Sequence, residues 1–364
     1  MSSMFKNNIS FSIFGESHGK AIGVVIDNLP SGEYIDMEKV SEYMRRRAPK
    51  KDGTTTPRAE KDIPEVVSGL LNEKTTGTPL TAIIQNTDTK SKDYANVSKL
   101  ARPGHADYTG NVRYKGYNDV RGGGHFSGRL TAPLCFVGAV CSQILERRGI
   151  YVGGHILQIH NTKDKSFDSV SVTRDDILEV RHKDFPTISD EKGQMMFKDI
   201  LKAREGLESL GGIIECVAIN VPAGIGSPMF DGLENTISQL MFGIPAVKGI
   251  EFGAGFEVAN MTGSQNNDNF YIDDRHRVRT KTNNHGGILG GISSGMPIVC
   301  RVAIKPTPSI AQEQETIDYS TMENSIIQIK GRHDPCIVPR AVPCVESVMS
   351  IAILSHMIGQ STPL

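Results

Sequence analysis

The sequence of 364 residues lacks tryptophan and lacks any excess of one charge, with 40 Lys and Arg against 41 Asp and Glu. The resulting net charge of -1 provides no bulk field that would attract nucleic acid or a membrane, so basic character must be local. The six cysteines form no C-x-x-C pair and are scattered through apolar runs. That pattern argues against a disulfide framework or a zinc site, and it indicates reduced core thiols in a cytoplasmic protein.

Signatures of several other protein classes are also missing. No H-E-x-x-H motif, G-K-[ST] motif or aspartate cluster occurs, so we expect neither a dedicated metal site nor a P-loop ATPase. Residues 1–8 contain no apolar core of a signal peptide. We also find no apolar run of the ~18 residues needed to span a bilayer. We therefore predict a protein with no metal, no nucleic-acid partner and no membrane partner.

The most informative segment that is present is a glycine-rich loop, Arg121–Arg129, which runs directly into an apolar segment. We predict a buried helix there, with Ser127 as the N-cap and Gly149 as the stop. Consecutive glycines allow backbone N–H groups to approach a ligand, and a helix N-terminus favours anions. Arg121 and Arg129 add fork-shaped donors for phosphate or carboxylate. The alternative is a tight glycine turn with solvated arginines.

An internal repeat predicts two similar halves. Residues 24–32 and 217–224 both read as a strand that ends in Pro-small-Gly. In each case an aspartate, Asp36 or Asp231, is expected to start a helix that contains apolar-Ser-x-x-Met. Two such halves packed together would form one pseudo-symmetric α/β domain spanning 1–364, although chance similarity of short segments remains open. We expect strands at 11–14, 22–26, 66–71, 79–85, 152–159, 212–221 and 297–304, and helices at 36–44, 190–210 and 342–359.

Histidines in glycine-bounded turns suggest acid–base chemistry. His18, His105 and His125 lie in such turns, and His333 lies between an arginine and an aspartate. Histidine exchanges protons near neutral pH, and several arginines accompany these positions. The residues alone predict an enzyme acting on a small phosphorylated anion and leave the reaction open. By contrast, His155, His160 and His182, in or beside a charged excursion at 161–189, are expected to fill the core or surface.

Four motifs carry a family resemblance: Gly15–Gly19 (GESHG), Arg102–Asp107 (RPGHAD), Arg121–Gly124 (RGGG) and Gly331–Cys336 (GRHDPC). In order and spacing they resemble the chorismate synthases over nearly the whole chain. The resemblance implies an α/β (α+β) fold, a β-α-β sandwich with internal pseudo-symmetry and central helices between antiparallel sheets. It also implies a homotetramer.

The resemblance further implies a carbon–oxygen lyase of the shikimate pathway and of aromatic amino-acid biosynthesis. Its reaction would be the 1,4-anti elimination of phosphate from 5-enolpyruvylshikimate 3-phosphate to give chorismate. It would require reduced FMN (FMNH2) without net redox change. NADPH is a possible reductant, and a separate flavin reductase is a possible partner, because the sequence contains no appended reductase domain.

Residue roles follow from the same resemblance, position by position. His18 resembles the histidine that protonates the departing phosphate, His105 the one that protonates reduced flavin, and Asp334 the aspartate that helps to deprotonate flavin N5. Substrate-binding positions are Arg46, Arg47, Arg102, Ser127, Arg129 and Arg332. FMN-binding positions are His125, Phe126, Ser127, Pro245, Ala246, Gly290, Lys305, Pro306, Thr307, Pro308, Ser309 and Arg332. Arg46 is in addition the NADP-binding position.

This chain departs from the family pattern after the three glycines. The family commonly reads Arg-Ser-Ser-Ala-Arg-Glu-Thr, whereas this chain has His125-Phe126-Ser127-Gly128-Arg129-Leu130-Thr131. Where the family often has a further arginine, this chain has Asp52-Gly53. The departures motivate an alternative function, a flavin-binding protein of the same fold that has lost or altered turnover. A phosphate-binding regulatory module is a third hypothesis, which explains the arginines but not the histidine turns.

Overall fold

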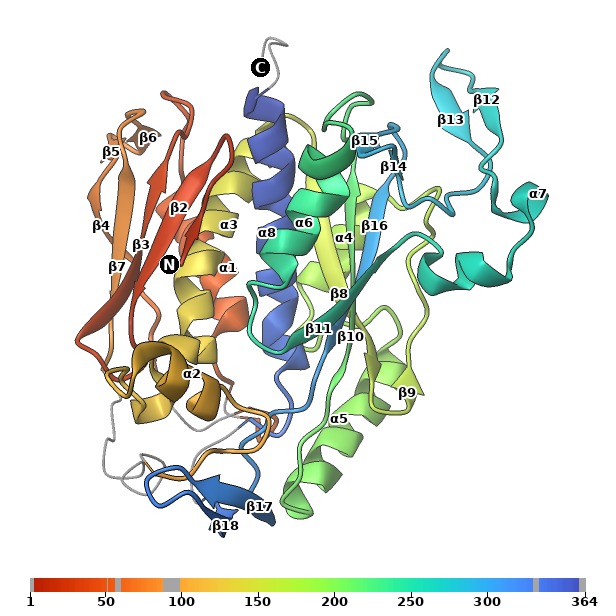
Figure 1. Ribbon diagram of the computed structural model, residues 1–364. Coiled ribbons are helices and arrows are strands. Elements are labelled where there is room, and N and C mark those ends of the chain that lie inside the picture. The colour runs from red at the N-terminus through yellow and green to blue at the C-terminus, as the bar shows by residue number, and fades with distance from the viewer. Residues whose placement is uncertain (1–2, 51, 56–59, 88–98, 330–333, 360–364) are drawn as a thin grey trace.

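The computed structural model describes residues 3–50, 52–55, 60–87, 99–329 and 334–359. Figure 1 shows three layers: a sheet from the N-terminal half, a layer of helices, and a sheet from the C-terminal half. Both five-stranded sheets are antiparallel throughout. The predicted sandwich of antiparallel sheets around central helices is therefore confirmed.

The elements of the three layers are as follows. The first sheet has the order β1 (Met4–Phe5), β2 (Ser10–Gly15), β3 (Ala21–Asp27), β7 (Leu80–Gln85) and β4 (Glu65–Ser68). The second has the order β11 (Val247–Phe252), β16 (Ile298–Ile304), β10 (Gly212–Ile219), β8 (Tyr151–Ile159) and β9 (Thr162–Lys163). The central helices are α1 (Met37–Arg47), α3 (Thr131–Arg147), α6 (Leu233–Met241) and α8 (Val338–Gly359).

Smaller elements surround this frame. They are the hairpins β5 (Leu70–Leu71) with β6 (Lys74–Thr75), β12 (Phe270–Ile272) with β13 (Val278–Thr280), β14 (Ile288–Leu289) with β15 (Ile292–Ser293), and β17 (Glu313–Asp318) with β18 (Glu323–Gln328). The remaining helices are α2 (Asp107–Tyr114), α4 (Arg174–Arg181), α5 (Asp190–Glu205) and α7 (Gly263–Asn266). Short 3-10 helices are η2 (Arg121–Phe126), η3 (Gly128–Leu130), η4 (Met229–Asp231) and η5 (Gly255–Asn260).

The burial pattern of the strands explains which sequence signals they carry. In β3, Ile22, Val24 and Ile26 are fully buried at every second position. The central strand β10 is instead a continuous apolar run, because its outward-facing Val217 and Ile219 pack in a second cluster with Ile177 of α4. A strand covered on both faces loses alternation. The excursion at 161–189 therefore covers the outer face of the second sheet.

Equivalent hydrogen bonds confirm the internal repeat. After β3, Gly32 N donates to Thr75 O at 2.7 Å, and the Thr75 hydroxyl donates to Pro30 O at 2.6 Å. After β10, Gly224 N donates to Ser293 O at 2.9 Å, and the Ser293 hydroxyl donates to Pro222 O at 2.5 Å. Asn28 and Asn220 occupy the same left-handed conformation, with φ of 65° and 63°. Both halves thus contain the same strand–turn–helix unit, stabilised by the same pair of hydrogen bonds.

The predicted helix starts are only partly correct. Asp36 does cap α1, accepting from the backbone N–H groups of Glu38 and Lys39. Asp231 does not cap α6: it ends η4, and Gly232 is the N-cap without a side-chain hydrogen bond. Ser127 accepts from Arg129 N and caps η3, so α3 itself begins four residues later, at Thr131. Helix signals in the sequence predicted a helical segment here, but they did not separate the short 3-10 helix from the α-helix that follows it.

Two core helices contradict the expectation that no segment could span a bilayer. Residues 128–147 and 338–359 are long and apolar enough by length and composition, yet 94% and 89% of their apolar windows are buried inside the protein. Both sheets and α1 pack around these helices, so their apolar surface is already covered by protein. Their hydrophobicity is therefore explained by a central position in the fold. The six cysteines are all buried and free, as predicted.

The helices α3 and α8 lie side by side in the same direction. Cys135 contacts Cys344, and Gly138 faces Ser347, so the residue offset stays constant along the pair. A Cβ built on Gly138 would lie 2.1 Å from the Cβ and Oγ of Ser347. Only glycine allows the two backbones to approach this closely. Both helices consequently begin at the same end of the molecule.

We expect Gly138→Ala to destabilise the protein by about 1–3 kcal/mol through overpacking against Ser347, although alanine improves helix propensity by about 1 kcal/mol at an open site. Urea denaturation of both proteins measures the difference. In a Ser347→Gly background the same substitution should cost clearly less. A Gly138→Ala protein as stable as the parent would contradict the proposed close contact.

Candidate active site

The glycine loop that precedes α3 has a conformation only glycine adopts readily. Gly122, Gly123 and Gly124 have φ of 59°, 84° and 53°. A Cβ on Gly124 would lie 1.8 Å from Asp119 O, and Gly124 O accepts a hydrogen bond from Ser17 N at 3.1 Å. The three glycines therefore serve a tight backbone crossing between the loop and the turn after β2.

This loop lies between two of the predicted catalytic histidines. A Cβ on Gly122 would lie 2.1 Å from Cε1 and Nδ1 of His18, and one on Gly123 would lie 3.1 Å from Nε2 of His105. Each imidazole thus packs against one of two consecutive glycines. His18 and His105, which are 87 positions apart in the sequence, are brought to one loop at the N-terminal end of α3.

A second cluster surrounds His105. Its Nδ1 lies 2.7 Å from Oδ1 of Asp107, which also accepts from Nη2 of Arg102 at 2.7 Å. The other oxygen, Oδ2, accepts from Nε of Arg102 at 2.7 Å. Burial alone would raise the pKa of Asp107, but hydrogen bonds from Arg102 and His105 outweigh that effect and hold the pKa far below its usual range. Arg102 Nη1 in addition donates to Ser309 Oγ at 3.3 Å.

A third cluster joins two more predicted arginines. Arg47 donates to Oδ2 of Asp62 at 2.8 Å, and Arg129 forms an ion pair with Oδ1 of the same carboxylate. Arg47 also donates to Gly128 O at 2.8 Å and to Oγ1 of Thr131 at 3.0 Å. Burial opposes ionisation of Asp62, yet Arg47 and Arg129 lower its pKa below the usual range. Arg47, the last residue of α1, is therefore buried and only 4% exposed.

Asp334 lies four residues before the start of α8 and is connected to this cluster through Arg340. It accepts from Nη1 of Arg340 at 2.7 and 3.0 Å, and Arg340 Nε donates to the backbone oxygen of Arg47 at 3.0 Å. Arg340 therefore links the predicted catalytic aspartate to the C-terminal end of α1. Arg332, predicted for substrate and FMN, lies outside the described residues, as does His333.

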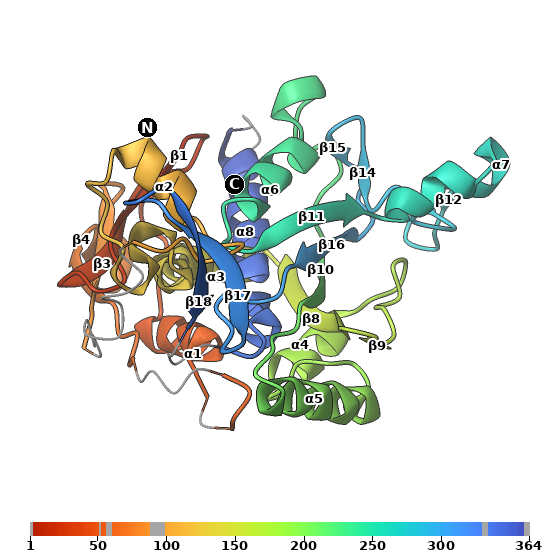
Figure 2. The same ribbon diagram turned by 60° about the horizontal axis from the view of Figure 1, so that its bottom comes forward.

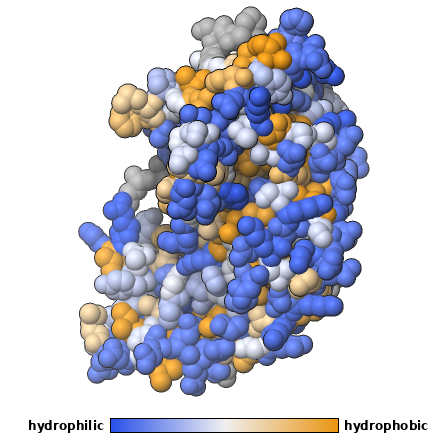
Figure 3. Space-filling view, turned by 90° about the vertical axis from the view of Figure 1, so that its right-hand side faces the viewer, coloured by the Kyte–Doolittle hydropathy of each residue, from blue (hydrophilic) through white to orange (hydrophobic). Residues whose placement is uncertain are grey.

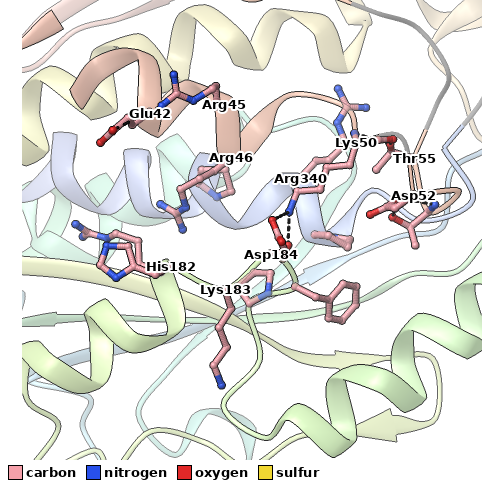
Figure 4. A pocket seen from close by; sticks show the side chains of 16 residues that line it. Glu42, Arg45, Arg46, Lys50, Asp52, Thr55, His182, Lys183, Asp184 and Arg340 are labelled. Carbon is pink, nitrogen blue, oxygen red and sulfur yellow. Dashed lines mark hydrogen bonds and ion pairs between the residues drawn. The ribbon is translucent and has the colours of Figure 1, made fainter. Parts of the chain in front are cut away.

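Arg46 faces in a different direction from Arg47. Its two terminal nitrogens bind Glu346 of α8 at 2.5 and 2.8 Å. Arg46 and Arg340 border a cavity of about 230 Å³ between α1, α8 and residues 181–186 (Figure 4). Lys50 closes one side of this cavity through its bond to Asp184. The cavity is lined by cations that already have carboxylate partners, including Arg181 with Glu146 and Lys183 with Asp190.

The predicted flavin positions separate into two groups. Lys305 N donates to Ala246 O at 3.0 Å, the Lys305 ammonium binds Gly104 O, and Ser309 binds Arg102, so 245–246 and 305–309 meet the His105 cluster. Gly290 lies in the β14–β15 turn at the opposite end of β16 from Lys305. Seven residues of strand separate the two ends by about 23 Å. One chain does not bring Gly290 to this site.

The residues that depart from the family pattern face inward and fasten the loop. His125 Nδ1 lies 2.8 Å from Gly15 O, and its Nε2 binds the Ser3 hydroxyl. The Phe126 ring packs 6.2 Å from that of Tyr114 on α2, and Leu130 is buried. The His125 and Phe126 side chains therefore contact Ser3, the end of β2 and α2. Their role visible here is to anchor the glycine loop.

Sequence reasoning missed the carboxylates that organise the site. Asp62, Asp107 and Glu346 each bind at least one predicted arginine, and Arg340 binds Asp334. The R-x-x-H-x-D spacing was a signal for Asp107, because a buried arginine and histidine need a nearby anion. No local signal pointed to Asp62 or Glu346, whose partners lie far away in sequence. Figure 2 brings forward the end of the sandwich at which α3 and α8 begin, and the β17–β18 hairpin lies across this end.

Comparison with known proteins agrees with this arrangement. The family model described as chorismate synthase matches residues 9–358. The chain is 44% identical over 97% of its length to "Chorismate synthase" of Korarchaeum cryptofilum, covering 97% of that protein. It is 44% identical over 95% of its length to the Methanothermobacter thermautotrophicus protein of the same name, covering 91% of it.

The chain belongs to the chorismate synthase family. A solved structure titled "Crystal Structure of Chorismate Synthase" superposes with a TM-score of 0.75 at 29% identity, covering 96% of this chain and 92% of that one. Chorismate synthases are lyases of aromatic amino-acid biosynthesis. The family and its named relatives favour this function over a binding protein without turnover.

We expect Asp62→Asn to destabilise the protein by about 3–5 kcal/mol at pH 7, because it leaves Arg47 and Arg129 buried without their shared anion. The folded-state pKa of Asp62 is lowered, so its contribution is present above its unfolded pKa of about 3.9 and is lost as pH falls through the folded value.

Urea unfolding of both proteins across this acid range tests the sign. The stability difference between parent and variant should shrink as the pH falls below about 4. Asp274→Asn, which removes an exposed aspartate in the turn between β12 and β13, serves as the control. A difference between parent and Asp62→Asn that is independent of pH would contradict the assignment.

Proposed function

We propose that this chain converts 5-enolpyruvylshikimate 3-phosphate to chorismate by 1,4-anti elimination of phosphate. The observation that carries the proposal is the placement of His18 and His105 on consecutive glycines, Gly122 and Gly123, at the N-terminal end of α3. Histidines can donate protons, and these two lie beside a helix N-terminus and near buried arginines. This combination suits a reaction in which phosphate leaves.

The proposed substrate site uses Arg47, Arg102 and Arg129, with Ser127 beside them. Arg129 supports this role because its Nη2 is buried and has no hydrogen-bond partner among the described residues, with Oε2 of Glu60 3.9 Å away. A donor in that state can bind a substrate oxygen. A side chain on Gly128 would meet nothing within 4 Å, so open space lies beside Ser127 and Arg129. Arg332 is proposed to add a further contact.

Proton handling is assigned to three groups. His18 donates a proton to the departing phosphate, since it lies in the turn nearest the loop. His105 holds a proton at Nε2, on the side of Gly123, while its Nδ1 faces Asp107. Asp334 accepts a proton, and Arg340 keeps its carboxylate in place. A site between β17–β18 and the helix N-termini would also limit access of water.

The residues present fit a reduced FMN. Lys305, Thr307 and Ser309 offer an ammonium and two hydroxyls in one short segment, and Thr307 Oγ1 is buried without a partner among the described residues. These residues, with Ser127 and Ala246, would hold the phosphate and polar tail. When bound, the reduced flavin supplies the electron density that promotes cleavage of the carbon–oxygen bond.

The source of reduced flavin is proposed to lie outside this chain, in a separate flavin reductase of a cytoplasmic system. Arg46, the position predicted for NADP, has both terminal nitrogens bound to Glu346. These donors are therefore less available to a nucleotide phosphate. NADPH as a direct reductant remains the competing proposal, with the cavity in Figure 4 as its place.

A homotetramer is proposed as the active assembly. The arm formed by η5, α7 and the β12–β13 hairpin projects from the body in Figure 1, and Phe256, Phe270 and Ile272 on it are 85%, 62% and 63% exposed. Figure 3 views the molecule from this side and shows apolar side chains at several places on a largely polar face. Apolar residues on a projecting arm support docking to a second copy. Gly290 would also reach a flavin only from another chain.

Anaerobic turnover tests the proposed reaction. With chemically reduced FMN, phosphate and chorismate should appear in equal amounts, and replacing the reductant by NADPH tests direct reduction. His105→Ala should lose roughly 100-fold or more in kcat, the usual contribution of a general acid, and still bind FMN. His285→Ala, a histidine far from the glycine loop, is the control. Substrate and reduced FMN that bind without product would overturn the proposal.

Light scattering tests the assembly. We expect a mass four times that of the chain at micromolar concentration, and a smaller species for the double variant Phe270→Glu/Ile272→Glu, because charges on the arm oppose its docking. Met322→Glu changes an even more exposed apolar residue, in the β17–β18 turn, and should leave the mass unchanged. A monomeric parent protein would refute the proposed tetramer.

A further inference from the structure

The carboxylate of Asp107 contacts the side chains of both Arg102 and His105. It receives two charge-assisted hydrogen bonds from Arg102 at 2.7 Å and one from His105 Nδ1 at 2.7 Å, and it also accepts from Arg102 N at 3.0 Å. It begins α2 and is buried. Asp107 is not among the residues proposed to bind substrate, to bind flavin or to transfer a proton.

The position of Arg102 creates an electrostatic conflict that Asp107 resolves. Arg102 Nη2 lies 3.1 and 3.4 Å from the two ring nitrogens of His105. A guanidinium at that distance repels a proton on the imidazole, and the repulsion is stronger in a partly buried site than in water. The Asp107 carboxylate binds both side chains, so its attraction offsets this repulsion.

The same hydrogen bond sets the orientation of the imidazole ring. Because Nδ1 faces an ionised carboxylate, it carries the hydrogen, and the free edge of the ring presents Nε2. That nitrogen is the atom closest to Gly123. Through Arg102 and its bond to Ser309, the carboxylate also links this ring to the 305–309 segment.

We propose that Asp107 is the positioning residue of the site: it holds His105 with Nε2 toward the glycine loop, enables it to carry a proton beside Arg102, and sets Arg102 against Ser309. The inference rests on the proposed function, since it concerns the same proton donor. It adds a group that acts through His105 and Arg102 rather than by touching the reacting atoms.

Asp107→Asn tests the proposal, because the amide keeps the shape of the side chain and removes the charge. We expect a loss in kcat of about 10–100-fold, similar to that of other orienting partners of histidine, and a rise in KM through the misplaced Arg102. In a His105→Ala background the kcat loss should vanish, because the ring that Asp107 positions is absent, while the KM change should remain. A kcat loss that persists undiminished in this background would overturn the proposal.

A second variant and a second measurement exclude a simple folding defect. Asp107→Glu keeps the charge and moves it by one methylene, so the protein should keep its thermal midpoint and still lose kcat. Hydrogen exchange at imidazole C2, measured by mass spectrometry on the flavin-free protein, should change for His105 in Asp107→Asn and stay constant for His285. Unchanged exchange at His105 together with parental kcat would refute the inference.

The control is a matched aspartate–histidine pair. Asp268 binds His285 Nδ1 at 2.8 Å, far from the glycine loop. Asp268→Asn should alter exchange at His285 and leave kcat unchanged. If the parent enzyme itself releases no phosphate, the proposed function fails. If the parent turns over and Asp107→Asn matches it, only the inference about Asp107 fails.

Discussion

The parallel pairing of α3 with α8 is the constraint on which the site depends. Gly138 allows the two helices to touch at Ser347, and the two sheets pack around them. Since both helices run in the same direction with a constant offset, their N-terminal ends lie at one end of the sandwich. The segment before α3 carries the glycine loop and Arg129, and the segment before α8 carries Asp334. Packing in the centre of the molecule thus decides where the proposed catalytic groups meet.

At this end of the sandwich, two carboxylates each bind two basic side chains. Asp62 binds Arg47 and Arg129, and Asp107 binds Arg102 and His105. A buried cation without any partner would be too costly, whereas one carboxylate per cation would leave nothing for a ligand. Sharing keeps the arginines ordered and leaves Nη2 of Arg129 without a hydrogen-bond partner among the described residues. A buried donor of that kind suits a substrate with a phosphate and carboxylates.

The sequence allowed much of the fold to be predicted, and some of the site. Strands with alternating or continuous apolar residues were located well, as was the repeat whose two turns share the same hydrogen bonds. The start of α3 was placed too early because a 3-10 turn has no separate propensity signal. The arginines were found as a set, but their directions were not: Arg46 and Arg47 are neighbours in sequence and bind Glu346 and Asp62 respectively.

Local sequence patterns by themselves predicted which segments form the candidate site. Three glycines in a row, histidines in turns and their spacing are properties of short stretches, and they led to His18, His105 and the glycine loop without a structure. Tertiary structure alone decided the partners. Asp62 reaches Arg129, Glu346 reaches Arg46, and Gly290 lies away from Lys305 because helix packing and strand direction set distances that no local pattern encodes. The reason is physical: a buried charge is satisfied by whichever opposite charge the fold brings near, and that choice is made across the whole chain.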